Sequence, residues 1–242
     1  MFALENNSIG EKIIIEGNYA RVARSPHRVK IPGEYSADLA YLAGYHLGDG
    51  YLDNPLRRGR KQSHEVVYCD QYKEQMQLVS SIFSKEFELP LVLVKKRDDA
   101  WVGRRNSKVI HIFLNKILML PVGRKGTFTI PPWVFDNSEL LTAFISGFFD
   151  AEGCIFVDKY KKFGICCTNT NKPFLQSIRE ILRVKYNVTF GEIYRKPNGN
   201  VFEMKIRSKA EIARFCKNIG FRHPNKVKKA DIFMHDNFKF PF

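Results

Sequence analysis

Residues 145–153 read ISGFFDAEG, an apolar run that ends with two acids, Asp150 and Glu152. Residues 42–50, LAGYHLGDG, align with this stretch position by position. The segments after the two stretches are also similar in kind: alternating strand-like residues, a helical pattern, a hairpin-like pair of strands and a short helix. The chain therefore reads as one structural unit used twice.

Small residues recur at every fourth position in both stretches, which places them on one face of a helix. Counted from two residues before each stretch, they are Ala40, Gly44 and Gly48 in the first and Ala143, Gly147 and Ala151 in the second. Such a stripe lets two helices approach closely, although each stripe could instead pack on its own sheet. We favour helix on helix, because both stripes are in register with an acidic end and pairing them brings those ends together.

The alignment separates the two acids of the second stretch. Asp49 aligns with Glu152, whereas Asp150 aligns with Leu47. A role that needs one carboxylate from each half can therefore use Asp49 and Glu152, and we expect Asp150 to orient or cap near the interface. Two carboxylates held together would repel, and a hard cation such as Mg²⁺ would relieve that repulsion. The alternative is that both aligned acids are ordinary helix-ending turn residues.

Local patterns predict the elements of each unit. In the second unit we expect two strands, a helix, a hairpin around a Pro-Asn-Gly turn and a helix opened by a capping box, at residues 155–161, 163–168, 172–186, 194–208 and 208–220. In the first unit we expect strands at 51–56, 65–69, 91–97 and 108–113 and helices at 72–87 and 115–120. This divides the chain into an extension of open role (1–35), a first unit (36–120), a linker rich in Pro and Gly (121–137) and a second unit (138–242).

The chain is strongly basic, with 39 Lys and Arg against 25 Asp and Glu and a net charge of +14. This balance favours a polyanionic partner such as nucleic acid, with an anionic membrane surface as the rival. The longest strongly apolar stretch, residues 140–149, is too short to span a bilayer. The first fifteen residues lack the pattern of a signal peptide, so we expect an intracellular protein, in the cytoplasm or an organelle matrix.

LAGYHLGDG and ISGFFDAEG resemble the two motifs of monomeric LAGLIDADG homing endonucleases, and the resemblance covers about residues 37–235. It implies an α+β fold of two pseudo-twofold related αββαββα units, with the motif helices packed at the interface and two antiparallel sheets forming a DNA-binding saddle. The eighth motif position of this family holds the metal-binding acids, here Asp49 and Glu152. The carbonyls of Gly48 and Ala151 would be additional metal ligands. Leu47 departs from the consensus, but not at the eighth position.

The resemblance further implies sequence-specific hydrolysis of one phosphodiester on each strand of a double-stranded DNA target, in intron homing, by a monomer that uses Mg²⁺ or, as a substitute, Mn²⁺. Lys125 and Lys226 are catalytic candidates by position, with a solvated surface charge as the alternative for each. Four residues where the second strand of each unit enters its helix would order water: Asp70, Gln71, Asn169 and Thr170.

DNA contacts would come from the polar sheet faces and the basic loops, since strand ribbons fit the major groove. The candidates are Arg57, Arg58, Arg60, Lys61, Arg104, Arg105, Arg195, Lys196, Glu203, Lys205 and Arg207. Charge runs of this kind are often only solvated faces. Here several runs fall at corresponding loops of the two halves, which favours binding.

Two other functions fit the same fold: a group I intron maturase that binds its own intron RNA, and a DNA-binding regulator that does not cleave. An acid at both eighth positions favours the enzyme, because a pure binder does not need two acids held together beside a phosphate backbone.

Overall fold

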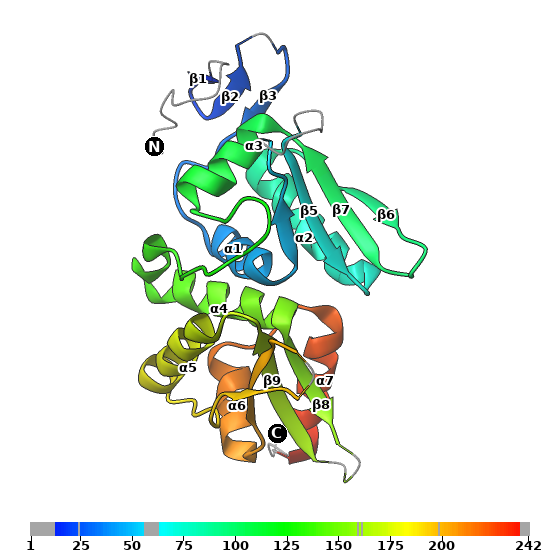
Figure 1. Cartoon of the computed structure of the whole chain (residues 1–242), viewed down its shortest axis with the longest axis vertical. Helices are drawn as coiled ribbons and strands as arrows, with labels where there is room; N and C mark the ends of the chain where they lie inside the picture. The colour runs from blue at the N-terminus through cyan, green and yellow to red at the C-terminus, as the bar shows by residue number, and fades with distance from the viewer. Residues whose placement is uncertain are drawn as a thin grey trace.

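The computed structural model describes residues 13–23, 25–55, 63–158, 160, 162–197 and 199–237. Helices α1 (Ala37–Asp49) and α4 (Ser138–Glu152) lie side by side in the middle of the molecule, and the two units extend to opposite sides of this pair (Figure 1). The predicted α+β fold of two αββαββα units is therefore confirmed.

The two central helices touch through their backbones. A Cβ atom added at Gly44 would lie 2.0 Å from the carbonyl oxygen of Phe144, and one added at Gly147 would lie 2.1 Å from that of Tyr41. These two contacts are equivalents of each other under the sequence repeat. The small-residue stripes thus pack helix on helix, as predicted, and around a pseudo-twofold axis.

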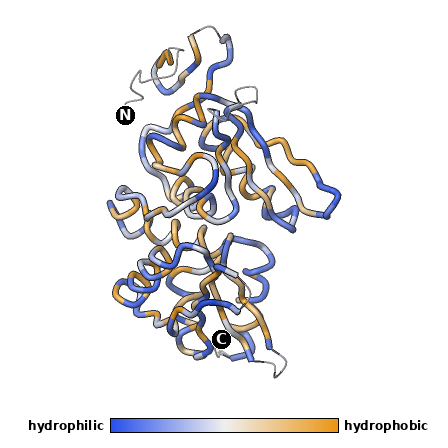
Figure 2. Tube along the Cα trace, viewed as in Figure 1, coloured by the Kyte–Doolittle hydropathy of each residue, from blue (hydrophilic) through white to orange (hydrophobic). Residues whose placement is uncertain are grey.

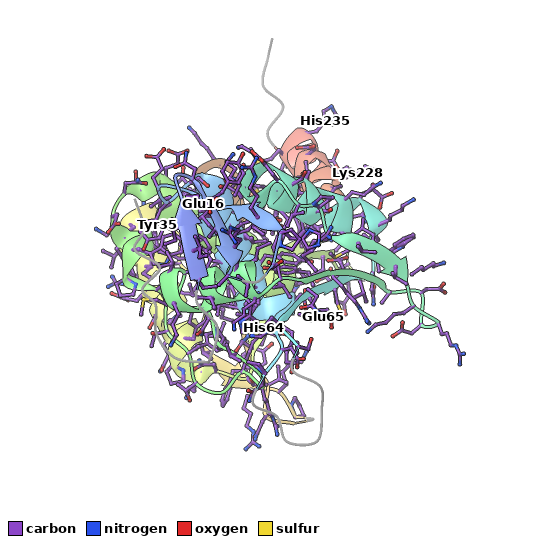
Figure 3. All side chains as sticks on the ribbon, turned by 90° about the horizontal axis from the view of Figure 1, so that it is seen from above. Glu16, Tyr35, His64, Glu65, Lys228 and His235 are labelled. Atoms are coloured by element: carbon purple, nitrogen blue, oxygen red, sulfur yellow. The ribbon has the colours of Figure 1, made fainter. Side chains whose placement is uncertain are left out.

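Each unit builds one antiparallel four-stranded sheet. In the first unit the strand order is β4-β5-β7-β6, with β4 (Gly50–Leu52), β5 (Glu65–Asp70), β6 (Val92–Lys95) and β7 (Trp101–Asn106). In the second it is β8-β9-β11-β10, with β8 (Gly153–Val157), β9 (Phe163–Asn169), β10 (Tyr194–Arg195) and β11 (Phe202–Ile206). The β6–β7 hairpin projects from the rest of the first unit (Figure 3).

The remaining helices follow the strands of their unit. They are α2 (Lys73–Phe87), α3 (Lys108–Ile112), the π-helical turn η1 (Phe113–Ile117), the 3₁₀ turn η2 (Pro132–Phe135), α5 (Lys172–Tyr186), α6 (Lys209–Asn218) and α7 (Pro224–Asn237). Over the described ranges, no helix is both long enough and apolar enough to cross a membrane.

A third sheet joins β1 (Ile13–Glu16), β2 (Tyr19–Val22) and β3 (Arg28–Lys30) at the end of the first unit that lies away from α4 (Figure 1). The Tyr19 hydroxyl donates to the Glu88 carboxylate at 3.0 Å. This contact ties the sheet to the end of α2.

Three sequence expectations are corrected. Residues 108–113 were expected as a strand but begin α3, because the Ser107 hydroxyl accepts the Ile110 backbone N–H and caps a helix there. The strand lies earlier, in β7, and the helix expected at 115–120 is the π-helical turn η1. At the expected capping box, the Ser208 side chain makes no cap bond, and the Glu211 carboxylate accepts from the Thr189 backbone N–H.

The backbone contact predicts that Gly147→Ala destabilises the protein by about 2 to 4 kcal/mol, because overlap with a carbonyl outweighs the better helix propensity of alanine. Urea unfolding measures this loss. Gly126→Ala is the matched control, since a Cβ there meets nothing within 4 Å. Equal stability of the two variants would contradict the close approach.

Candidate active site

The carboxyl ends of α1 and α4 bring one acid from each half together. Asp49 ends α1 and Glu152 ends α4. The ends are in contact, because a Cβ added at Gly48 would lie 2.8 Å from Glu152 Cγ and 2.4 Å from Ala151 Cβ. Both acids therefore stand at helix C-termini, where backbone carbonyls add negative character.

The electrostatics of these acids favour a cation. Asp49 is exposed, but the protein atoms around its carboxylate reduce its hydration, and this together with Glu152 and Asp70 raises the pKa of Asp49 to about 7. Burial also raises the pKa of Glu152, against the opposing effect of Lys125, Asn169 and Lys226. Among the hydrogen bonds of the described residues, none reaches the Asp49 carboxylate. Carboxylates crowded in this way suit a hard divalent ion.

Two lysines reach the same helix ends, Lys125 from the connection after the first unit and Lys226 from the first turn of α7. Lys125 Nζ donates to the carbonyl of Leu47 at 3.1 Å and also to that of Gly48. Lys226 Nζ donates to the carbonyls of Phe149, at 2.9 Å, and Asp150. Burial lowers the pKa of Lys125 to about 8, although Asp49 and Glu152 oppose that shift. Neither lysine is a solvated surface charge.

The strand ends beside the acids differ between the halves. Asn169, at the end of β9, donates to Glu152 Oε1 at 2.8 Å and so orients it. Asp70, at the end of β5, accepts from the Tyr45 hydroxyl at 2.9 Å and the Tyr72 backbone N–H at 2.7 Å. The other two candidates for ordering water are exposed residues of the following turns, namely Gln71 and Thr170.

Asp150 has a different environment from the paired acids. Only 1% of it is exposed, and its Oδ2 accepts from the Tyr41 hydroxyl and the backbone N–H groups of Arg222 and His223, each at 2.8 Å. It thus joins α1 to the segment that leads into α7. This agrees with the expectation that Asp150 orients the interface.

Sequence reasoning missed Arg222 and His223, which bridge the halves. Arg222 donates to the Asp38 carboxylate at 2.7 Å, and His223 Nε2 lies 3.5 Å from Asp70 Oδ1. Neither residue was part of a repeat or a motif. The only available signal was the Pro at position 224, which suits the first turn of a helix such as α7.

The outer face of the second sheet is charged but internally paired. Lys205 donates to the Tyr194 hydroxyl at 2.7 Å, and Lys196 lies 3.5 Å from the buried Glu203 carboxylate. Arg207 donates to Asp158 Oδ2 at 2.6 Å. At the hairpin tip, the exposed Arg195 donates to Asn200 Oδ1 at 2.7 Å.

In the first unit, two neighbouring arginines of β7 point to opposite faces of the sheet. Arg104 lies on the outer face, whereas Arg105 lies on the helix-covered face and donates to the Pro90 carbonyl. Four of the predicted DNA contacts lie outside the described residues: Arg57, Arg58, Arg60 and Lys61.

Known proteins are similar to this chain in sequence. Residues 139–220 match the LAGLIDADG-like domain family. Homing endonuclease I-ApeI of Aeropyrum pernix is 28% identical over 188 residues, which are 74% of this chain and 83% of that protein. A glutamine–fructose-6-phosphate aminotransferase of Methanocaldococcus jannaschii is 28% identical over 86% of this chain, but the chain spans only 18% of that protein's length. For the replication factor C small subunit of the same organism that share is 10%.

Solved structures share the fold. The crystal structure of I-DmoI in complex with DNA and Mn has a TM-score of 0.57 and 22% identity, and the match covers 76% of this chain and 96% of that one. Full-length DUF199/WhiA from Thermatoga maritima has a TM-score of 0.58 and 15% identity, over 90% of this chain and 65% of that one.

The duplicated motif helices, the acid at the end of each and these likenesses support the resemblance of the chain to double-motif LAGLIDADG homing endonucleases.

The raised pKa of Asp49 predicts a pH-dependent gain in stability for Asp49→Asn. The folded pKa of about 7 exceeds the unfolded value, so the charged form destabilises the fold above pH 7 and no longer does so near pH 4. With screening by solvent, we expect a gain of about 1 to 2 kcal/mol at pH 8 and none at pH 4. Denaturant unfolding in a metal chelator measures it.

Asp98→Asn, in the exposed β6–β7 connection, is the matched control for that measurement. A gain for Asp49→Asn that is the same at both pH values would contradict crowding of the carboxylates.

Proposed function

We propose that the protein is a sequence-specific DNA endonuclease that hydrolyses one phosphodiester on each strand of a duplex with the help of divalent metal. The observation that carries the proposal is the pair of acids, Asp49 and Glu152, one from each half, at adjoining helix ends. A cut in each strand needs a carboxylate for each phosphate, and a pseudo-twofold protein supplies the two from equivalent positions.

The donor set fits Mg²⁺, or Mn²⁺ in its place. Asp49 and Glu152 supply hard carboxylate oxygens, and a bound cation would relieve the repulsion between their negative charges. The carbonyls of Gly48 and Ala151 remain the proposed additional ligands. Such an ion, when bound, activates water and stabilises the leaving oxygen.

The chain's own residues would hold and orient the reacting groups. Asn169 fixes the Glu152 carboxylate through its hydrogen bond, while Asp70, held by Tyr45, stands at the equivalent place in the other half. Lys125 and Lys226 place positive charge beside the acids, where it would balance a scissile phosphate. The outer sheet faces and the basic surface would bind the duplex backbone and read its bases.

The relatives support a self-contained module that acts on DNA. I-ApeI is named a homing endonuclease, and the I-DmoI structure is a complex with DNA and Mn. Similar segments form 18% and 10% of two M. jannaschii proteins with unrelated names, so the module is not tied to either of those activities. We further propose that the protein acts as a monomer inside the cell, on a target in an intron's host gene.

A DNA-binding protein that does not cleave is the second candidate, and the likeness to WhiA favours it, because this fold occurs there under a name other than endonuclease. The crowded acids count against it. A carboxylate pair that destabilises the metal-free fold serves no purpose in a protein that only binds a polyanion. Binding of the protein's own intron RNA, as a maturase, would be a third outcome of the same assays.

We predict that Glu152→Gln lowers Mg²⁺-dependent cleavage by more than about 100-fold, beyond the range for residues that only support metal ligands. DNA binding should persist, since the change leaves the sheet faces intact. Cut ends on the host allele without the intron, mapped at single-nucleotide resolution, measure cleavage, and gel shifts in Ca²⁺ measure binding.

Asp150→Asn is the isosteric control, because an amide oxygen can still accept from the N–H groups of Arg222 and His223. It should lose far less activity. Equal losses in the two variants would refute the assignment of the acids.

Binding should also depend steeply on salt. If about six or more phosphates are neutralised, affinity falls by about 1,000-fold or more between about 50 and 200 mM salt. Arg195→Ala should reduce the slope by about one, as expected for loss of one phosphate contact, while Lys185→Ala on the outer side of α5 should not. Fluorescence anisotropy measures the slope, and an affinity independent of salt would rule out binding through the sheets.

A further inference from the structure

One row of residues crosses the outer face of the first sheet from edge to edge. Tyr51 of β4 is opposite Val67 of β5, Val67 is opposite Arg104 of β7, and Arg104 is opposite Val92 of β6. Alternate residues of β5, such as Val66, face the helices and are fully buried, so this row faces the other way. A single guanidinium therefore stands between two valines.

The valines at the β6 edge are open to solvent. Val92 is 55% exposed and Val94, in the next row, is 50% exposed. Beside them, the connection between β6 and β7 is hydrophilic, and Figure 2 shows its hydrophilic tip next to the apolar strand. An apolar, exposed strand at a sheet edge is typical of a surface that binds a partner.

The outer face of the second sheet carries different side chains from the outer face of the first. Its outer rows run from Cys154 through Cys166 to Lys205, and from Thr168 through Glu203 to Tyr194. These rows carry charges and hydroxyls where the first sheet carries methyl groups. The two halves therefore cannot recognise the same base pattern.

Duplex DNA matches the first row better than a second copy of the chain does. A second copy carries the same net charge of +14 and would be repelled, whereas DNA is attracted. In the major groove, the thymine 5-methyl group is the apolar feature that valine can contact, and the guanine edge offers two acceptors to an arginine. Arg104 is only 4.0 Å from the Glu65 carboxylate, which can hold its guanidinium over the face.

We propose that this row reads thymine methyl groups in the half of the target that faces the first sheet, with Val67 and Val92 on the methyl groups and Arg104 on a guanine between them. The proposal rests on the proposed function, because it requires sequence-specific DNA binding. It adds that the two halves of the target differ in kind: one is read largely by methyl contacts, the other by charged and hydroxyl side chains.

The test begins with duplexes selected from a randomised pool by binding to the full chain. Each thymine of a selected site is then replaced by uracil, which removes only the methyl group. Affinity should fall about fourfold for each contacted thymine in one half, which corresponds to the about 0.8 kcal/mol of one buried methyl group. Uracil in the other half should change it by less than about twofold.

The variant Val92→Thr tests the same contact from the protein, because threonine has nearly the same shape as valine and lacks one methyl group. In this variant the uracil effect at one thymine should disappear. Val184→Thr, an equally exposed valine on α5, should leave every uracil effect unchanged. The substitution of DNA alone keeps the test valid even if a protein variant folds poorly.

The test distinguishes failure of the proposed function from failure of this inference alone. Selection of no preferred duplex would overturn the proposed function together with this inference. Specific binding in which uracil has no effect in either half would overturn the inference and leave the proposed function intact. A chain that is dimeric by sedimentation and becomes monomeric in Val92→Thr would show that the β6 edge binds a second copy, which also overturns it.

Discussion

The contact of two backbones at Gly44 and Gly147 is the constraint on which the rest of the structure depends. With no side chain between them, α1 and α4 fit in one register, and that register places the last turns of both helices together. The two acids, the two lysines and the strand ends depend on it, because each is attached within a few residues of a helix end or bonded to one. The site is thus a product of helix packing.

The polar network at the interface holds this arrangement in place. Asp150 accepts one hydrogen bond from α1 and two from the segment before α7, so one buried carboxylate ties together both halves and the helix that carries Lys226. A buried carboxylate needs donors that converge on it, and here three of them converge on Oδ2. Its aligned partner, Leu47, has an apolar side chain that cannot accept such bonds, which is one reason why the two halves are similar but not identical.

The sequence predicted the repeated motif helices and failed at one strand and at the contacts between distant segments. The helix pair, the matching of Asp49 with Glu152 and the helix at 172–186 could be read from spacing alone. The strand of β7 was misplaced, because residues 108–113 alternate as a strand would, while a single hydroxyl at Ser107 caps a helix there. The partners of Asp150 could not be predicted, since backbone N–H groups of residues far along the chain leave no mark in the sequence.

The close crossing of α1 and α4 also fixes the distance between the two acids. The separation of the two acids is set by glycines deep in the interface, while side chains on the outer sheet faces would decide which bases the protein recognises. For an enzyme that cuts both strands, the offset between the two nicks would then be a fixed length, whatever sequence the sheets come to recognise. Substitutions on the outer sheet faces would change the DNA sequence that is cut but would leave the length of the overhang unchanged.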